Sequence, residues 1–243
     1  MKEPKTPKAW ANLLSSAWGA RFPVDVRTIA MEYTARRFPD PITKIARADV
    51  DAFEGALISR PDKGCWYVLY NPKISVSGRI NFTLGHELGH YLLHRVEAQS
   101  FECNQRDLLD YGGPNSRKRE QEANVFASYL LMPLDDFRRQ TGAGPVTLDD
   151  LGSCAERYNV SLTAAALKWL EYTPQRAVLV LARDDFILWS RASEAAFKTG
   201  VFYRCGTPLP SNCVAKNGAP VGVRGGANLD YSRCAVKVSV SVD

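Results

Sequence analysis

Histidine is scarce in this sequence, and the patterns that mark several common protein classes are missing. Only three histidines occur in 243 residues. No apolar run approaches the length of a membrane-spanning helix, and nothing near the start resembles the apolar region of a secretory signal. The Gly-rich segment 218–226 lacks the Lys-Ser/Thr that follows a phosphate-binding loop, so it is better explained as a surface loop.

Cysteine is present, but never as a Cys-x-x-Cys pair. The six cysteines are scattered along the chain, at Cys65, Cys103, Cys154, Cys205, Cys213 and Cys234. We therefore expect reduced thiols and a cytoplasmic protein.

The composition is that of a folded protein with a mild positive charge. Hydrophobic residues make up 45% of the chain, enough for one large domain or two modest ones. The net charge is +5, and most of it lies in residues 174–243, which hold nine Lys and Arg against five Asp and Glu. This excess permits contact with nucleic acid or an acidic partner but argues for neither.

Two of the three histidines bracket a glutamate, in the order His86-Glu87-Leu88-Gly89-His90. On an α-helix, His86 and His90 stand one turn apart, so both imidazoles can reach one ion. Glu87 lies beside them, where a carboxylate can take a proton from an activated water without being a ligand. A hydrogen-bonded histidine pair on a buried helix is the simpler alternative, but the amphipathic setting favours a metal site.

The third histidine, His94, continues the spacing of the first two. It lies roughly 12 Å along the helix axis from His86, too far to share an ion without a break in the helix. We expect His94 to be structural or at the surface. The opposite side of this helix is apolar and should face the core, through Leu84, Leu88, Tyr91 and Leu92.

The missing third ligand is expected on a second helix, at residues 117–132. Its Glu120 shares a face with small residues, and Gly85 and Gly89 flank the histidines of the first helix. Two helices with small residues at i and i+4 could approach closely enough for Glu120 to reach the ion. Asn124, one turn further on, could then hydrogen-bond a ligand and fix its orientation.

Glu122 is the weaker candidate for the third ligand, because it points roughly 200° away from Glu120 on the same helix. The remaining alternative is that both glutamates are surface charges and that the third ligand lies elsewhere.

The rest of the chain alternates between strands and helices. Residues 53–59 and 65–70 indicate a hairpin before the histidine helix, and residues 96–117 a loop-rich insert. Residues 148–158 and 162–171 indicate two short helices around a tight turn, whose second helix is poor in residues that read DNA bases. Beyond Pro174 the pattern is mostly β, with strands at residues 177–181, 186–189 and 234–242.

The residues of three motifs together carry a resemblance to a known family. With His86-Glu87-Leu88-Gly89-His90, Glu120-Gln121-Glu122-Ala123-Asn124-Val125-Phe126-Ala127 and Leu130-Leu131-Met132-Pro133, the sequence resembles the ImmA/IrrE metallopeptidases over residues 24–172. The resemblance implies a gluzincin-like catalytic core, zinc or another divalent ion such as Mn²⁺, and cleavage of a helix-turn-helix repressor that controls stress or mobile-element genes. It also places the third ligand at Glu120.

We therefore predict an α+β fold in four parts. Residues 1–23 form an N-terminal segment, and residues 24–147 a gluzincin-like metallopeptidase domain with a small β-sheet and metal-binding helices. Residues 148–173 form a helix-turn-helix-like segment. Residues 174–243 form a mostly β domain, for which the resemblance suggests a regulatory or sensory role.

The expected activity is that of a zinc-dependent endopeptidase. Two imidazoles and one carboxylate leave a position open for water, as in catalytic zinc sites. Glu87 is expected to act as general base and to pass the proton to the leaving amine. Tyr111, Tyr129 and Arg117 are candidates for stabilising the oxyanion by their neighbourhood alone.

The expected partner is a protein substrate, a helix-turn-helix repressor encoded nearby; direct DNA binding is not favoured and no membrane is involved. The rival hypothesis is a regulator that binds a repressor or DNA without cutting, with a structural or vestigial metal site.

Overall fold

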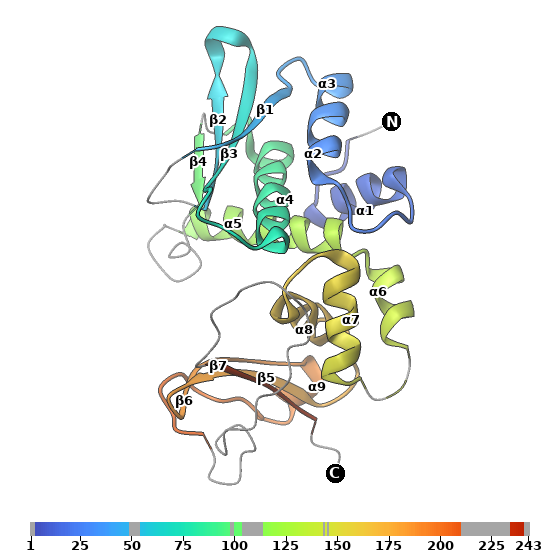
Figure 1. The fold of residues 1–243 in the computed structure, drawn as a ribbon, viewed down its shortest axis with the longest axis vertical. Coiled ribbons are helices and arrows are strands. Elements are labelled where there is room, and N and C mark those ends of the chain that lie inside the picture. Colours follow the sequence, from blue (N-terminus) through green and yellow to red (C-terminus); the bar gives the residue numbers. More distant parts are fainter. Residues whose placement is uncertain are drawn as a thin grey trace. The chain divides into compact units, whose positions relative to one another are not determined.

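The chain folds into two compact units, each described here by itself. The computed structural model describes residues 3–48, 54–97, 100–103, 114–142, 144, 146–209 and 234–240 (Figure 1). The first unit comprises Met1–Arg139 with Arg157–Val160, and the second Gln140–Glu156 with Ser161–Asp243. Both contain helices and a small sheet, so the predicted α+β class is confirmed. In the part of the chain described, no helix is long and apolar enough to cross a membrane.

The sheet of the first unit has the order β1-β3-β2-β4. Its strands are β1 (Ile42–Arg47), β2 (Gly55–Arg60), β3 (Cys65–Tyr70) and β4 (Ser100–Cys103). The predicted hairpin of β2 and β3 is confirmed, and Gly64 closes its turn in the left-handed conformation. Two strands were not predicted. β1 pairs parallel with β3, and β4 pairs antiparallel with β2 inside the insert that the sequence marks as loop-rich.

Several helices lie beside this sheet. Helix α1 (Pro7–Trp18) begins after a Thr6 cap. A continuous helical stretch runs over α2 (Val26–Thr28), a π-helical turn (Ile29–Tyr33) and α3 (Thr34–Arg37). Helix α4 (Ser77–His94) lies against β2 and β3, while α5 (Pro114–Leu131) runs across the end of the sheet (Figure 1). Helix α5 begins three residues earlier than predicted, since Pro114 suits a first helical position.

Helices α4 and α5 touch through small residues, as the sequence predicts. A Cβ atom on Gly89 would lie 3.0 Å from Phe126 and 3.1 Å from the backbone of Ala123. One on Gly85 would lie 3.3 Å from the Cβ of Ala127. These three partners on α5 are fully buried, so the two helices approach as closely as their backbones allow.

The second unit packs helices on a three-stranded antiparallel sheet of order β6-β5-β7. Its elements include the predicted helices α7 (Leu148–Tyr158) and α8 (Leu162–Leu170), and the strands β5 (Ala177–Arg183), β6 (Phe186–Ala192) and β7 (Cys234–Val240). Asp184 and Asp185 turn the chain between β5 and β6 with positive φ angles. The short helices α6 (Leu134–Thr141), which starts in the first unit, and α9 (Glu194–Lys198) were not predicted. The predicted loop at residues 218–226 lies outside the described residues.

Replacing Gly89 with alanine should destabilise the protein, whereas the same change at Gly152 should stabilise it. Alanine is the better helix former by about 1 kcal/mol, and a Cβ on Gly152 meets nothing within 4 Å. At Gly89 the added methyl overpacks the α4–α5 contact, at a cost of about 1–3 kcal/mol that outweighs the gain in helix propensity. Urea unfolding of G89A and G152A measures both effects. A stabilised G89A would contradict the tight helix contact.

Candidate metal centre

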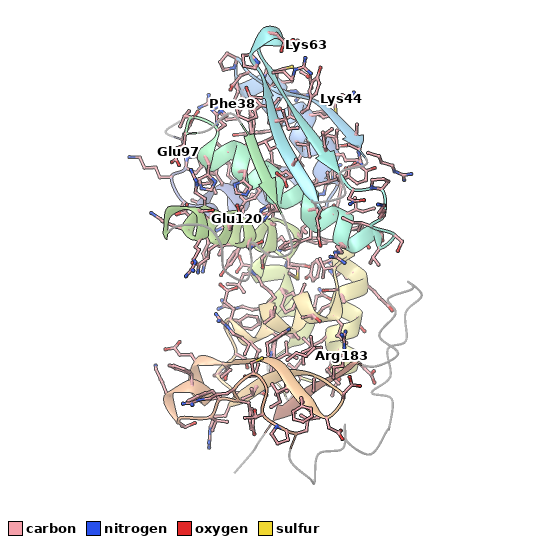
Figure 2. The ribbon with its side chains drawn as sticks, turned by 90° about the vertical axis from the view of Figure 1, so that its left-hand side faces the viewer. Phe38, Lys44, Lys63, Glu97, Glu120 and Arg183 are labelled. Atoms are coloured by element: carbon pink, nitrogen blue, oxygen red, sulfur yellow. The ribbon has the colours of Figure 1, made fainter. Side chains whose placement is uncertain are left out.

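Two histidines of α4 and one glutamate of α5 converge on a single point. The Nε2 atoms of His86 and His90 lie 2.9 Å apart. The carboxylate of Glu120 bridges them, with Oε2 at 3.1 Å from His86 Nε2 and Oε1 at 3.2 Å from His90 Nε2. Figure 2 labels Glu120 on α5. One potential ligand atom from each residue lies within 4.8 Å of the others, so this cluster could hold a metal ion.

The cluster fits a zinc ion by its chemistry and by its spacing. A tetrahedral zinc ion with bonds of about 2.1 Å holds its ligand atoms roughly 3.4 Å apart. The three atoms of the cluster are spaced slightly closer than this, at 2.9 to 3.2 Å. Small side-chain shifts would therefore open the site enough for an ion. Two imidazoles with one carboxylate are also the ligand set of catalytic rather than structural zinc.

Burial and mutual contact set the protonation of the three side chains. Burial lowers the pKa of His90 to about 4, against the opposing pull of Glu120. Burial also opposes protonation of His86, but Glu120, Glu87 and Asn124 together raise its pKa above the ordinary value. Burial disfavours an ionised Glu120, yet its close contacts with both imidazoles hold its pKa well below the usual range. An ionised carboxylate and a neutral His90 are the forms that bind metal.

The far nitrogen of each ligand imidazole is also engaged. His86 Nδ1 lies 2.9 Å from the Oδ1 of Asn124, the contact expected for a residue that orients a ligand. His90 Nδ1 lies 3.1 Å from His94 Nδ1, and His94 Nε2 lies 3.0 Å from Glu122 Oε2. The sequence pattern predicts no such contact between His94 and Glu122. The i+4 spacing from His90 to His94 was the one signal that could have revealed it.

Glu87 lies beside this cluster and outside it. Its side chain is fully buried, and its charge contributes to the raised pKa of His86. Its Oε1 comes within 2.7 Å of the place where a Cβ on Gly55 would sit. The first residue of β2 must therefore be glycine for Glu87 to lie against the sheet in this way.

The structure selects none of the three oxyanion candidates. Tyr111 lies outside the described residues. Tyr129 is nearly buried, and the Nζ atom of Lys8 in α1 stands 4.5 Å over its ring. Arg117 is exposed in the first turns of α5.

Together, the fold and this cluster define an α+β protein with a candidate metal centre on two crossing helices. A family model described as IrrE N-terminal-like domain, Peptidase_M78, matches residues 42–170, which is more than half of the chain. The chain belongs to this family, and the resemblance to ImmA/IrrE proteins is confirmed. Membership supports a metallopeptidase-like or a regulatory role.

The chain was also compared with curated proteins and with solved structures. No curated protein matches the chain. A solved structure titled "Mycobacterium tuberculosis transcriptional regulator" is similar, with a TM-score of 0.48 and 18% sequence identity, over 77% of this chain and 55% of that one. The chain thus spans little more than half the length of that protein.

Substituting Glu120 with glutamine should weaken zinc binding by more than about 100-fold, because it removes the one charged ligand of the cluster. Zinc affinity is measured by competition with a chromophoric chelator. Q121A is the control, since Gln121 is exposed on the same helix and should leave the affinity unchanged. Equal zinc affinity of E120Q and Q121A would exclude Glu120 as a ligand.

Proposed function

We propose that this protein is a zinc-dependent endopeptidase with a gluzincin-like catalytic core. The observation that carries the proposal is the convergence of His86, His90 and Glu120, with Glu87 adjacent but outside the cluster. A set of two imidazoles and one carboxylate leaves room for water or substrate, and an acid beside it that is not a ligand can move protons. Family membership supports the same assignment.

The proposed roles follow from the position of each side chain. His86, His90 and Glu120 would hold the ion, which when bound polarises a peptide carbonyl and acidifies water near neutral pH. Glu87 takes the proton of the attacking water on one carboxylate oxygen and delivers it to the nitrogen of the departing amine. Because Glu87 is fully buried, this proton exchange is shielded from bulk water.

The substrate is proposed to bind as an extended strand beside β4. Among the described strands β4 is the outermost on its side, and it pairs with β2 at Gly55, the residue against which Glu87 lies. A peptide added at this edge would be held mainly by its main chain, close to the proposed general base. The family resemblance suggests a helix-turn-helix repressor as the protein that supplies this peptide.

The proposal assigns catalysis to residues 24–147 and a regulatory or sensory role to residues 174–243. The intervening helix-turn-helix-like segment, residues 148–173, is proposed to pack rather than to bind DNA. Its helix α8 carries one basic residue, Lys168, whose side chain is buried with Nζ 3.6 Å from Glu171. A buried cation cannot neutralise DNA phosphates, which supply most of the affinity of DNA-binding proteins.

The decisive variant is E87Q, which keeps the shape of the side chain and removes its basicity. Zinc affinity should stay within about threefold of the wild type, because Glu87 is not proposed as a ligand. Cleavage of the helix-turn-helix repressor encoded beside the gene should slow by at least about 100-fold. Electrophoresis of the incubated pair measures the new fragments.

Two outcomes would count against the peptidase. Cleavage by E87Q at the wild-type rate would remove Glu87 from the mechanism. A zinc-loaded wild type that binds the repressor stoichiometrically and releases no fragment would favour the non-cutting regulator.

A further inference from the structure

All three histidines of the chain lie in one row on α4, and the row continues onto α5. The imidazoles of His86, His90 and His94 follow one another at intervals of four residues. His90 Nδ1 lies 3.1 Å from His94 Nδ1, and His94 Nε2 lies 3.0 Å from Glu122 Oε2. His94 is 3% exposed, whereas Glu122 is 33% exposed, so this row leads from the cluster towards the surface of α5.

For a neutral His94, the carboxylate at the outer end sets the order of donors and acceptors along this row. An ionised carboxylate only accepts hydrogen bonds, so the Nε2 of His94 must carry the hydrogen that faces Glu122. A neutral His94 then has a bare Nδ1, which can only accept. The Nδ1 of His90 must therefore be the donor, and its Nε2, the atom that faces Glu120, is left with a free lone pair.

We propose that His94 and Glu122 are positioning residues that hold His90 in the tautomer and ring orientation needed to bind the metal through Nε2. This inference rests on the metal site of the proposed function. It gives His94 a specific task, where sequence analysis expected a structural or surface residue. It also means that α5 supplies both a ligand, Glu120, and the outer end of the contact that orients another ligand.

The competing explanation is that His94 has a purely structural role. Two matched substitutions distinguish this explanation from the positioning role. H94N places an amide oxygen where His94 Nδ1 stands, so it can still accept the hydrogen from His90. H94L has the same branched shape without an acceptor. Both remove the contact with Glu122, and both replace a nearly buried side chain. Loss of packing should therefore affect them alike, whereas loss of the acceptor affects only H94L.

The expected result is a difference in zinc affinity within this pair. H94L should bind zinc about 10–100-fold more weakly than the wild type, as when other partners that orient metal ligands are removed. H94N should recover most of that loss. At the outer end, E122L should weaken zinc binding about tenfold, and E122Q should recover most of it because its amide oxygen still accepts.

Lys118 provides the control for the charge of Glu122. Its Nζ lies 3.9 Å from Glu122 Oε1 in an exposed pair. If E122L acted by breaking this pair, K118A would weaken zinc binding as much. We expect K118A to leave the affinity unchanged.

Nitrogen-15 NMR of the zinc-loaded wild type tests the tautomers directly, and three histidines give a simple spectrum. Hydrogens on His90 Nδ1 and His94 Nε2 are the expected result. A hydrogen on His94 Nδ1, or equal zinc affinities of H94L and H94N, would overturn the proposal.

These outcomes are distinguishable from failure of the peptidase assignment. A graded loss of zinc affinity without any repressor cleavage would support the positioning role and reject the peptidase. Cleavage of the repressor, with equal zinc affinities of H94L and H94N, would support the peptidase and reject the positioning role. A wild type that binds no zinc would overturn both.

Discussion

The close contact between α4 and α5 is the constraint on which the candidate site depends. Gly85 and Gly89 of α4 have no Cβ at this contact. The residues of α5 that face them, Ala123 and Ala127, have small side chains. Because the two backbones approach so closely, a carboxylate on one helix reaches two imidazoles on the other. The same crossing carries the side chains that engage the far nitrogens of those imidazoles. The site is thus built from two helices, and the sheet adds the surface against which Glu87 lies.

Electrostatics favours a cation at this candidate site. An acidic side chain, Glu120, lies largely buried and ionised between two imidazoles, of which His90 is held neutral. Burying a carboxylate costs folding free energy unless its charge is paired and its oxygens are hydrogen-bonded. The two imidazoles offset part of this free-energy cost, and a bound divalent ion would offset more of it. A buried charge that lowers the stability of the fold is typical of a functional site.

Much of this arrangement was predictable from the sequence, because helical spacing carries it. The two site helices, the β2–β3 hairpin and the small residues between α4 and α5 follow from local patterns. β1 and β4 do not. β1 pairs with β3 rather than with its neighbour in sequence, β2, and β4 has four residues within a polar insert. The contact of Glu122 with His94 is also not predicted by helical spacing. The spacing gives only the direction in which a side chain leaves its own helix. It cannot give the reach of a long side chain towards a crossing neighbour.

The central claim is that one divalent ion is bound jointly by the two crossing helices. Anomalous diffraction at the zinc edge, from crystals grown with zinc, tests it most directly. The account predicts one strong peak within bonding distance of His86 Nε2, His90 Nε2 and a Glu120 oxygen, with Glu87 uncoordinated. A peak coordinated by other residues, or no peak at this position in zinc-saturated crystals, would contradict it.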